Sequence, residues 1–237
     1  MGAEASIPRM NRKGFLDLVY FTDPQKMQKL LAVLVDGMGT TLSIFFWTLL
    51  FSLPLGLFVA LGRMSRRRVV SGPVAFYILV MRGTPLMLQI ITVHFILPGL
   101  LGINIDRFIS TIVAFSLNYA AYFAEIYRGG IRSIPQGQYE AGKVLGFTRV
   151  QTFFRIVLPQ AVKRILQPVS NEVITLVKDT SLATVIAVGE LFRAAKNEAS
   201  RTASIEPLFV AGAFYLLMNF LVTCFFQWTE KKLDYYK

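Results

Sequence analysis

Charged side chains are scarce in this sequence of 237 residues, because Asp, Glu, Lys and Arg together make up only 16% of it. A soluble globular domain carries roughly 25%. Cysteine and histidine occur once each, as Cys224 and His94. One cysteine cannot build a disulfide framework, and neither residue is frequent enough for a cysteine- or histidine-rich metal centre. We therefore expect no metal site and no disulfide-stapled fold.

Motifs for ATP hydrolysis and membrane proteolysis are missing too. The sequence has no Gly-x-x-x-x-Gly-Lys-Ser/Thr loop to hold phosphates and no His-Glu-x-x-His pair to hold a catalytic metal. We therefore expect that this chain is not an enzyme, and that the energy for any process it serves comes from elsewhere.

Apolar residues make up 54% of the chain, and the net charge is +11. A basic chain can bind nucleic acid, but that function needs its Lys and Arg on a polar domain. Here they lie between apolar runs, which is typical of cytoplasmic loops beside anionic lipid headgroups. The composition predicts an all-α membrane protein.

Five apolar segments are candidates for membrane-spanning helices, each of which needs about 20 residues. A break at residues 82–85 interrupts the second segment, and charged residues interrupt the fourth. The segments are residues 37–62, 71–97, 108–124 with an extension past Glu125, 166–189, and 207–229.

Lys and Arg concentrate after the first, third and fifth segments, and such regions face the cytoplasm. Five spans place all three regions on one side. We therefore predict a cytoplasmic C-terminus and an N-terminus outside, although the N-terminal segment is itself partly basic. The residues are Arg63, Arg66, Arg67 and Arg68, then Arg128, Arg132, Lys143, Arg149, Arg155, Lys163 and Arg164, then Lys231, Lys232 and Lys237.

The basic region after the third segment carries clear helix signals. Pro135 marks the start of a short helix through Leu145, and Gly146 suits the left-handed residue that ends it. Thr148 begins a capping box that opens a second helix, which Pro159 ends or kinks. This pattern predicts two short cytoplasmic helices with a sharp bend at Gly146. They either dock on a partner or form a solvated amphipathic loop.

The same region resembles the cytoplasmic coupling motif of ATP-binding cassette (ABC) importer permeases. That motif reads Glu-Ala-Ala, three residues, Gly, nine residues, and Ile-x-Leu-Pro. The matching positions are Glu140-Ala141-Gly142, Gly146 and Ile156-Val157-Leu158-Pro159, with Gly142 in place of the second Ala. The stretches FYILVMRGTPLMLQ, NYAAYFAEIYRGGIRSIPQGQYEAG and NEVITLVKDTSLATVIAVGEL resemble the subfamily that imports polar amino acids and opines.

The resemblance implies a five-helix permease that works by alternating access at a bacterial inner membrane. Glu140, Ala141, Gly142 and Gly146 would couple it to an ATPase. Residues 1–33 would form a polar or interfacial segment, and residues 34–237 one transmembrane domain with a coupling loop at 129–164. The implied partners are two cytoplasmic ATPases, a second permease subunit, identical or not, and an extracytoplasmic solute-binding protein. ATP and magnesium would bind the ATPase, and no cofactor would bind this chain.

Ionisable groups at membrane depth usually face a cavity or a partner. Asn118, Tyr122 and Glu125 share one helix face at i, i+4 and i+7, and Glu172, Thr175 and Asp179 share another at i, i+3 and i+7. A free amino acid needs acceptors for its ammonium and donors for its carboxylate. The candidate substrate-binding residues are Asn118, Tyr122, Glu125, Asp179, Thr180 and Ser181.

Other roles for the charged residues stay open. Glu125 can instead pair with Arg128 at i+3. Arg82 is expected to satisfy backbone carbonyls freed at the break, with attraction of an anionic substrate group as the alternative. Glu172 and Lys178 are assigned to packing against the second permease subunit or to gating.

Three further functions are consistent with these residues. One is an ABC permease for another small solute, and another is a structural or sensor subunit. The third is an ion-coupled secondary carrier, in which inverted repeats are expected. We find no such repeat, and a carrier leaves the coupling motif unexplained.

Overall fold

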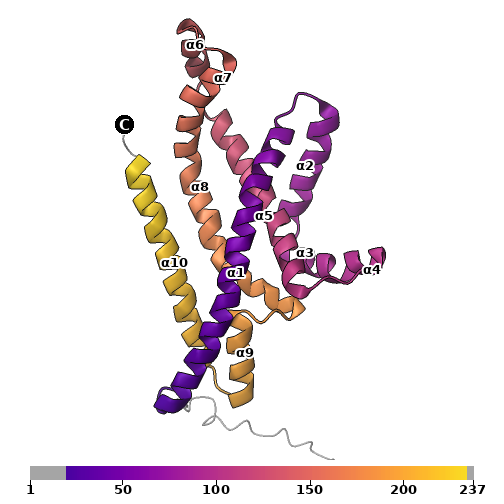
Figure 1. Cartoon of the computed structure of the whole chain (residues 1–237), viewed down its shortest axis with the longest axis vertical. Coiled ribbons are helices and arrows are strands. Elements are labelled where there is room, and N and C mark those ends of the chain that lie inside the picture. Colours follow the sequence, from indigo (N-terminus) through magenta and orange to yellow (C-terminus); the bar gives the residue numbers. More distant parts are fainter. Residues whose placement is uncertain (1–19, 234–237) are drawn as a thin grey trace, which may run out of the picture.

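The computed structural model describes residues 20–233, which form helices and no strand (Figure 1). Most of the expected N-terminal polar segment, and Lys237, lie outside the described residues. The elements are α1 Pro24–Arg63, α2 Arg68–Gly83, α3 Leu86–Ile91, the π-helical turn η1 Thr92–Ile96, α4 Leu97–Leu101, α5 Arg107–Arg132, α6 Gln136–Val144, α7 Arg149–Thr152, the π-helical turn η2 Phe153–Val157, α8 Leu158–Asp179, the 3-10 turn η3 Thr180–Ile186, α9 Leu191–Thr202 and α10 Glu206–Leu233.

Helix α1 is longer than its apolar segment. It begins at Pro24, where the side chain of Asp23 accepts hydrogen bonds from the backbone N–H groups of Gln25 and Lys26 at 3.0 and 3.3 Å. Proline suits a first helical turn because its missing N–H would have no partner there. The helix also continues through Pro54 to Arg63, so part of the segment expected to precede the membrane domain belongs to its first helix.

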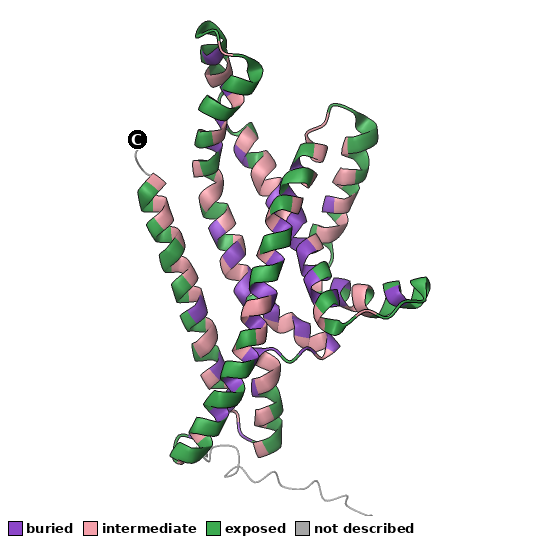
Figure 2. Ribbon diagram, in the orientation of Figure 1, coloured by how far each residue is buried: buried purple, intermediate pink, exposed green. Residues whose placement is uncertain are grey.

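Helix α5 is the centre of the bundle, and α1 packs along it. Its aromatic residues Phe115, Tyr119 and Phe123 are fully buried, with successive ring centroids 6.3 and 6.2 Å apart. Gly56 of α1 lies directly against this ladder, since a Cβ placed there would come within 2.8 Å of the Phe123 Cβ. Figure 2 shows buried residues gathered where α5 meets its neighbours, while α10 is mostly exposed.

The predicted break in the second apolar segment is confirmed at residues 84–85, but its geometry differs from expectation. Thr84 and Pro85 are both extended, with ψ angles of 149° and 132°, because a proline disfavours helix at the residue before it. Helices α2 and α3–α4 are bent by 110° at this point. The second half therefore turns aside (Figure 1) instead of continuing the span.

The second cytoplasmic helix is expected to end or kink at Pro159, and the structure shows that it does not end there. Helix α7 passes through η2 into α8 without interruption, and Pro159 lies in the first turn of α8. A π-helical turn is a common adjustment inside a longer helix, and here it precedes the proline. The fourth segment therefore begins at Leu158 and ends at Asp179, earlier than the expected 166–189.

Helices α1, α5 and α10 are each long and apolar enough to cross a membrane, and the bent pair α2 with α3–α4 passes the same test together. Helix α8 is more polar but has 22 residues, about 33 Å of helix, and lies beside α5 and α10. The basic loop after α1, the α6–α7 bend and the end of α10 share one end of the bundle, and α9 and the start of α1 share the other (Figure 1).

The close approach of α1 to α5 predicts different effects for two glycines of α1. Gly56→Ala should lower the thermal unfolding temperature of the purified protein, because the added methyl overlaps Phe123 and overpacking costs about 1–3 kcal/mol. Gly39→Ala is the control, since a Cβ there meets nothing within 4 Å. Equal unfolding temperatures for the two variants would contradict this packing.

Candidate functional site

A polar cavity of about 240 Å³ lies at the α2–α3 break, between α5 and α8. It brings together Asn118 and Tyr122 from one predicted helix face and Glu172, Thr175 and Asp179 from the other. Its lining residues are Thr84, Leu86, Asn118, Tyr119, Tyr122, Glu172, Thr175 and Asp179.

Two side-chain amides form hydrogen bonds with the backbone at the α2–α3 break, beside this cavity. Gln89 Nε2 donates to the Met81 carbonyl at 2.9 Å, and to the carbonyl and hydroxyl oxygens of Thr84 at 3.2 and 2.8 Å. Asn118 Nδ2 donates to the Met81 carbonyl and to Gln89 Oε1, both at 2.9 Å. Gln89 and Asn118 therefore satisfy the freed carbonyls, the role expected of Arg82. Because the amide nitrogen of Asn118 has only two N–H donors, its oxygen is the group left for a ligand.

The two carboxylates of the cavity differ in their surroundings. Asp179 Oδ2 accepts a hydrogen bond from the Tyr119 hydroxyl at 2.8 Å. Glu172 lines the same wall, and within residues 20–233 it has no hydrogen-bond or ion-pair partner. The same holds for the hydroxyl of Thr175. These groups are available to a polar ligand. Glu172, which the sequence analysis assigned to subunit packing or gating, therefore also lines the cavity.

A second cavity, of about 440 Å³, shares the Tyr122 side chain with the first and includes Arg63, Arg82 and Glu125. The Arg82 guanidinium carbon lies 5.1 Å from the centre of the Tyr122 ring, a cation–π distance. Glu125 forms an ion pair with Arg128 at 2.5 Å. Glu125 therefore lies next to the polar cavity and not in it. Its negative charge is balanced by Arg128.

The other two candidates on the fourth segment use their hydroxyls locally. Thr180 is buried and donates to the Val177 carbonyl at 2.7 Å, and Ser181 donates to the Lys178 carbonyl at 2.8 Å. Neither lines the polar cavity. Both hydroxyls instead stabilise the turn η3 where α8 ends.

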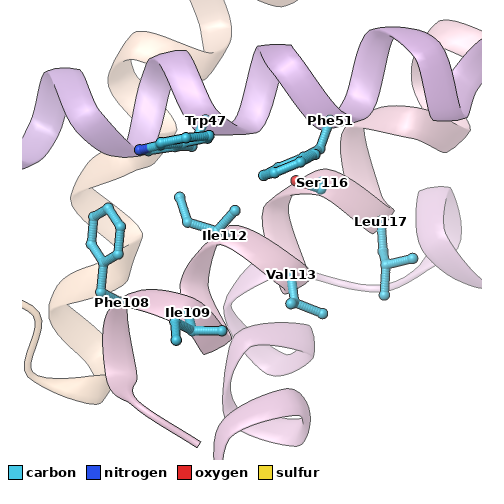
Figure 3. A pocket seen from close by; sticks show the side chains of 8 residues that line it. All are labelled: Trp47, Phe51, Phe108, Ile109, Ile112, Val113, Ser116 and Leu117. Carbon is cyan, nitrogen blue, oxygen red and sulfur yellow. The ribbon is translucent and has the colours of Figure 1, made fainter.

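Figure 3 shows a wider groove of about 480 Å³ between α1 and α5. Aromatic and aliphatic side chains surround it, and its polar side-chain groups are the Ser116 hydroxyl and the Trp47 indole N–H. A zwitterion would find no charged partner there. The lining residues are Trp47, Phe51, Phe108, Ile109, Ile112, Val113, Ser116 and Leu117.

At one end of the bundle, α6 and α7 form the predicted bend. Gly146 is left-handed with φ of 74°, and the Phe147 N–H donates to the Gly142 carbonyl at 2.9 Å. Thr148 and Gln151 make both hydrogen bonds of the capping box, at 2.9 and 3.2 Å. These local predictions are confirmed.

The exposed surface of this bend is apolar as well as charged. Gly142 faces inward, because a Cβ there would lie 2.6 Å from both Cγ2 and Oγ1 of Thr152. Glu140 and Ala141 are exposed. So are Val144 and Leu145, by 89% and 66%. Apolar side chains so exposed on a short protruding helix are typical of a docking surface, and sequence analysis missed them because it examined only the motif positions.

At the opposite end, the start of α1 is fastened to α9 and α10. The Tyr20 hydroxyl donates to Glu198 at 2.5 Å, and the Tyr20 N–H donates to Glu206 at 2.8 Å. Arg201 also donates to Glu198, at 2.5 and 2.9 Å, and these hydrogen bonds lower the pKa of the Glu198 carboxyl. Glu198 is thus held in its charged form, and it accepts hydrogen bonds from the Tyr20 hydroxyl and the Arg201 guanidinium.

Comparison with known proteins extends over most of the chain. Residues 52–235 match the family model described as binding-protein-dependent transport system inner membrane component. This match includes the break, the polar cavity and the α6–α7 bend.

Two similar proteins come from Bacillus subtilis (strain 168). The L-cystine transport system permease protein TcyB is 38% identical over 206 residues, 86% of this chain and 88% of that protein. The arginine transport system permease protein ArtQ is 39% identical over 201 residues, covering 84% and 92%. A crystal structure of an amino acid ABC transporter with histidines matches with a TM-score of 0.82 and 32% identity, over 89% of this chain and 98% of that chain.

The contact between Gly142 and Thr152 predicts a compensating pair of substitutions. Gly142→Ala should speed hydrogen exchange of the backbone amides in residues 140–152, because the new methyl pushes α6 away from Thr152. Adding Thr152→Ala should restore much of the protection by removing the overlapping atoms. Gly137→Ala is the control on the same helix, since a Cβ there meets nothing within 4 Å. Unchanged exchange in Gly142→Ala would contradict the contact.

Proposed function

This chain belongs to the family of binding-protein-dependent transport system inner membrane components, and from that premise we propose how it moves its substrate. It is a permease subunit of an ABC importer of the polar amino acid and opine type. It is the membrane subunit, and ATP hydrolysis belongs to a separate one. The proposal concerns the substrate cavity, the coupling surface and the direction of the helices.

The polar cavity at the α2–α3 break is the proposed substrate site. The supporting observation is that Glu172, Thr175 and Asp179 of α8 converge there with Asn118 and Tyr122 of α5. Carboxylates and the Asn118 oxygen suit an ammonium group. A volume of about 240 Å³ equals roughly eight waters at about 30 Å³ each, which fits a single small solute.

Three of the original candidates do not belong to this proposed site. Glu125 is paired with Arg128, and the hydroxyls of Thr180 and Ser181 are bonded to backbone carbonyls. Glu172 and Thr175 replace them. We assign Glu125 to the second cavity, which adjoins the first through Tyr122 and would be the next stage of the path.

The coupling surface is proposed to be Glu140, Ala141, Val144 and Leu145 on α6, with Gly146 setting the bend. Gly142 acts from inside the bend by letting α6 pack on Thr152. The uninterrupted helix from Arg149 through η2 to Asp179 is roughly 45 Å long. It joins the coupling bend to the wall that holds Glu172 and Asp179. Movement of the bend by an ATPase would therefore be transmitted directly to the cavity.

We place the α6–α7 end in the cytoplasm and the α9 end outside. The loop between α1 and α2 and the end of α10 share the α6–α7 end (Figure 1). These segments contain Arg63, Arg66, Arg67, Arg68, Lys231 and Lys232, which supports this direction. Two ATPases carrying ATP and magnesium would dock there, a solute-binding protein would dock at the outer end, and a second permease subunit would complete the path. Alternating access then follows from ATPases closing and reopening beneath the bend.

The alternatives are less well supported. An ion-coupled carrier would use Glu172 and Asp179 as coupling sites, but it would give the exposed apolar surface of α6 no partner. A permease for another small solute would need a cavity with different charges. Amino acids, with one ammonium and one carboxylate, suit the mixed charges around Tyr122.

Transport through the cavity predicts a selective defect in Asp179→Asn. In liposomes with its ATPase, permease and solute-binding partners, the variant should lose at least fivefold in substrate-stimulated ATP hydrolysis and keep its basal rate. The reason is that the lost charge acts on the substrate and not on the ATPase. Equal losses of both rates would identify Asp179 as a structural carboxylate. If no amino acid stimulated ATP hydrolysis by the wild-type complex, that result would contradict the importer function itself.

The coupling surface predicts different outcomes for two equally exposed valines. Val144→Glu should reduce copurification of the ATPase at least fivefold while the permease still inserts, because a charge replaces an apolar contact. Val69→Glu is the matched control, since Val69 is 87% exposed at the same end of the bundle. If both variants keep the ATPase, or both lose it, α6 is not the docking helix.

A further inference from the structure

The charges around the proposed substrate cavity are unbalanced. Two carboxylates, Glu172 and Asp179, line it, and no Lys or Arg is among its lining residues. Asp179 accepts one hydrogen bond, from a neutral tyrosine. Glu172 has no partner within residues 20–233. A half-buried carboxylate without a partner is unfavourable, so the cavity is built to receive positive charge.

Two cations lie outside the cavity lining. Arg82 stacks on Tyr122, the side chain shared by the two cavities, and its charge acts on Glu172. Lys178 is exposed beside Asp179 on α8 and forms no ion pair with it. Neighbouring positions on a helix point about 100° apart, and Lys178 is not among the lining residues, although its charge acts on Asp179. A ligand in the cavity would contact the two carboxylates, and the Arg82 guanidinium lies against the Tyr122 ring in the adjoining cavity.

Three kinds of amino acid can be compared with this set. A neutral amino acid has one cation and one anion, and would leave a carboxylate unpaired. An acidic amino acid would add a second anion to a site with two. An amino acid with a cationic side chain has two cations and one anion, and it matches all three protein groups with opposite charges.

The spacing of the two carboxylates agrees with a long ligand. Glu172 and Asp179 are seven residues apart on one helix face, about 10 Å along the axis. The α-ammonium and the terminal cation of a long side chain are also separated along an extended molecule.

On the basis of the proposed function, we propose that this cavity selects amino acids with a long cationic side chain, and that Glu172 receives the side-chain cation. Asp179 accepts the α-ammonium, and Arg82 lies toward the α-carboxylate. Glu172 is thus a specificity-determining residue. The names of similar permeases do not decide the matter, because arginine is cationic and cystine carries no net charge.

The test uses the purified permease–ATPase complex without solute-binding protein, so that only the membrane cavity can discriminate. Calorimetry compares L-arginine with L-citrulline, which replaces the guanidinium by a neutral group of similar size. Wild-type complex should bind arginine at least tenfold more tightly. Glu172→Gln should remove most of that difference, whereas Glu172→Asp should keep it. Asp179→Asn should weaken both ligands.

Two outcomes would overturn the proposal. One is a wild-type complex that binds citrulline as tightly as arginine, a result that does not depend on any variant folding. The other is Glu172→Gln with an unchanged preference. Neither affects the proposed importer function if the complete transporter still shows amino-acid-stimulated ATP hydrolysis. Loss of that stimulation with every amino acid would instead remove the function on which this inference rests.

Discussion

The hydrogen bonds that Gln89 and Asn118 make with the α2–α3 break are the constraint on which the site depends. They join the free carbonyls of Met81 and Thr84 to the central helix α5. Lipid offers no hydrogen bonds, so irregular backbone at membrane depth is stable only when protein groups or water satisfy it. These amides therefore stabilise the extended backbone of Thr84 and Pro85, and Thr84 and Leu86 line the cavity beside it.

The second constraint is the continuity of the helix that runs from Arg149 to Asp179. It is kept by the π-helical turn η2, which lets the helix pass Pro159. In the proposed mechanism this helix, which contains η2 and Pro168, moves as one body. The proposed coupling bend lies at one end of this helix and the carboxylates Glu172 and Asp179 lie toward the other, so in that mechanism movement of the bend would reach the cavity wall.

Local signals in the sequence predicted the local structure well. The left-handed Gly146, the capping box at Thr148 and the grouping of Glu172 with Asp179 all follow from short-range geometry. The 110° bend and the contact of Gly142 with Thr152 do not, because they depend on what packs nearby. Gln89 is an isolated amide in an apolar run, four residues after Pro85. It could have been predicted to hydrogen-bond the backbone carbonyls at the break. That Glu172 lines the cavity and has no partner within residues 20–233 follows only from the tertiary arrangement.

The most direct test of the account is the position of the α6 bend relative to the membrane. Val144→Cys in a Cys224→Ser background carries a single thiol on the exposed face of α6. With a membrane-impermeant maleimide, the account predicts no labelling in intact cells, strong labelling in inverted vesicles, and protection of the thiol when the ATPase is bound. Labelling in intact cells would contradict it, because force from a cytoplasmic ATPase could not then enter through α6.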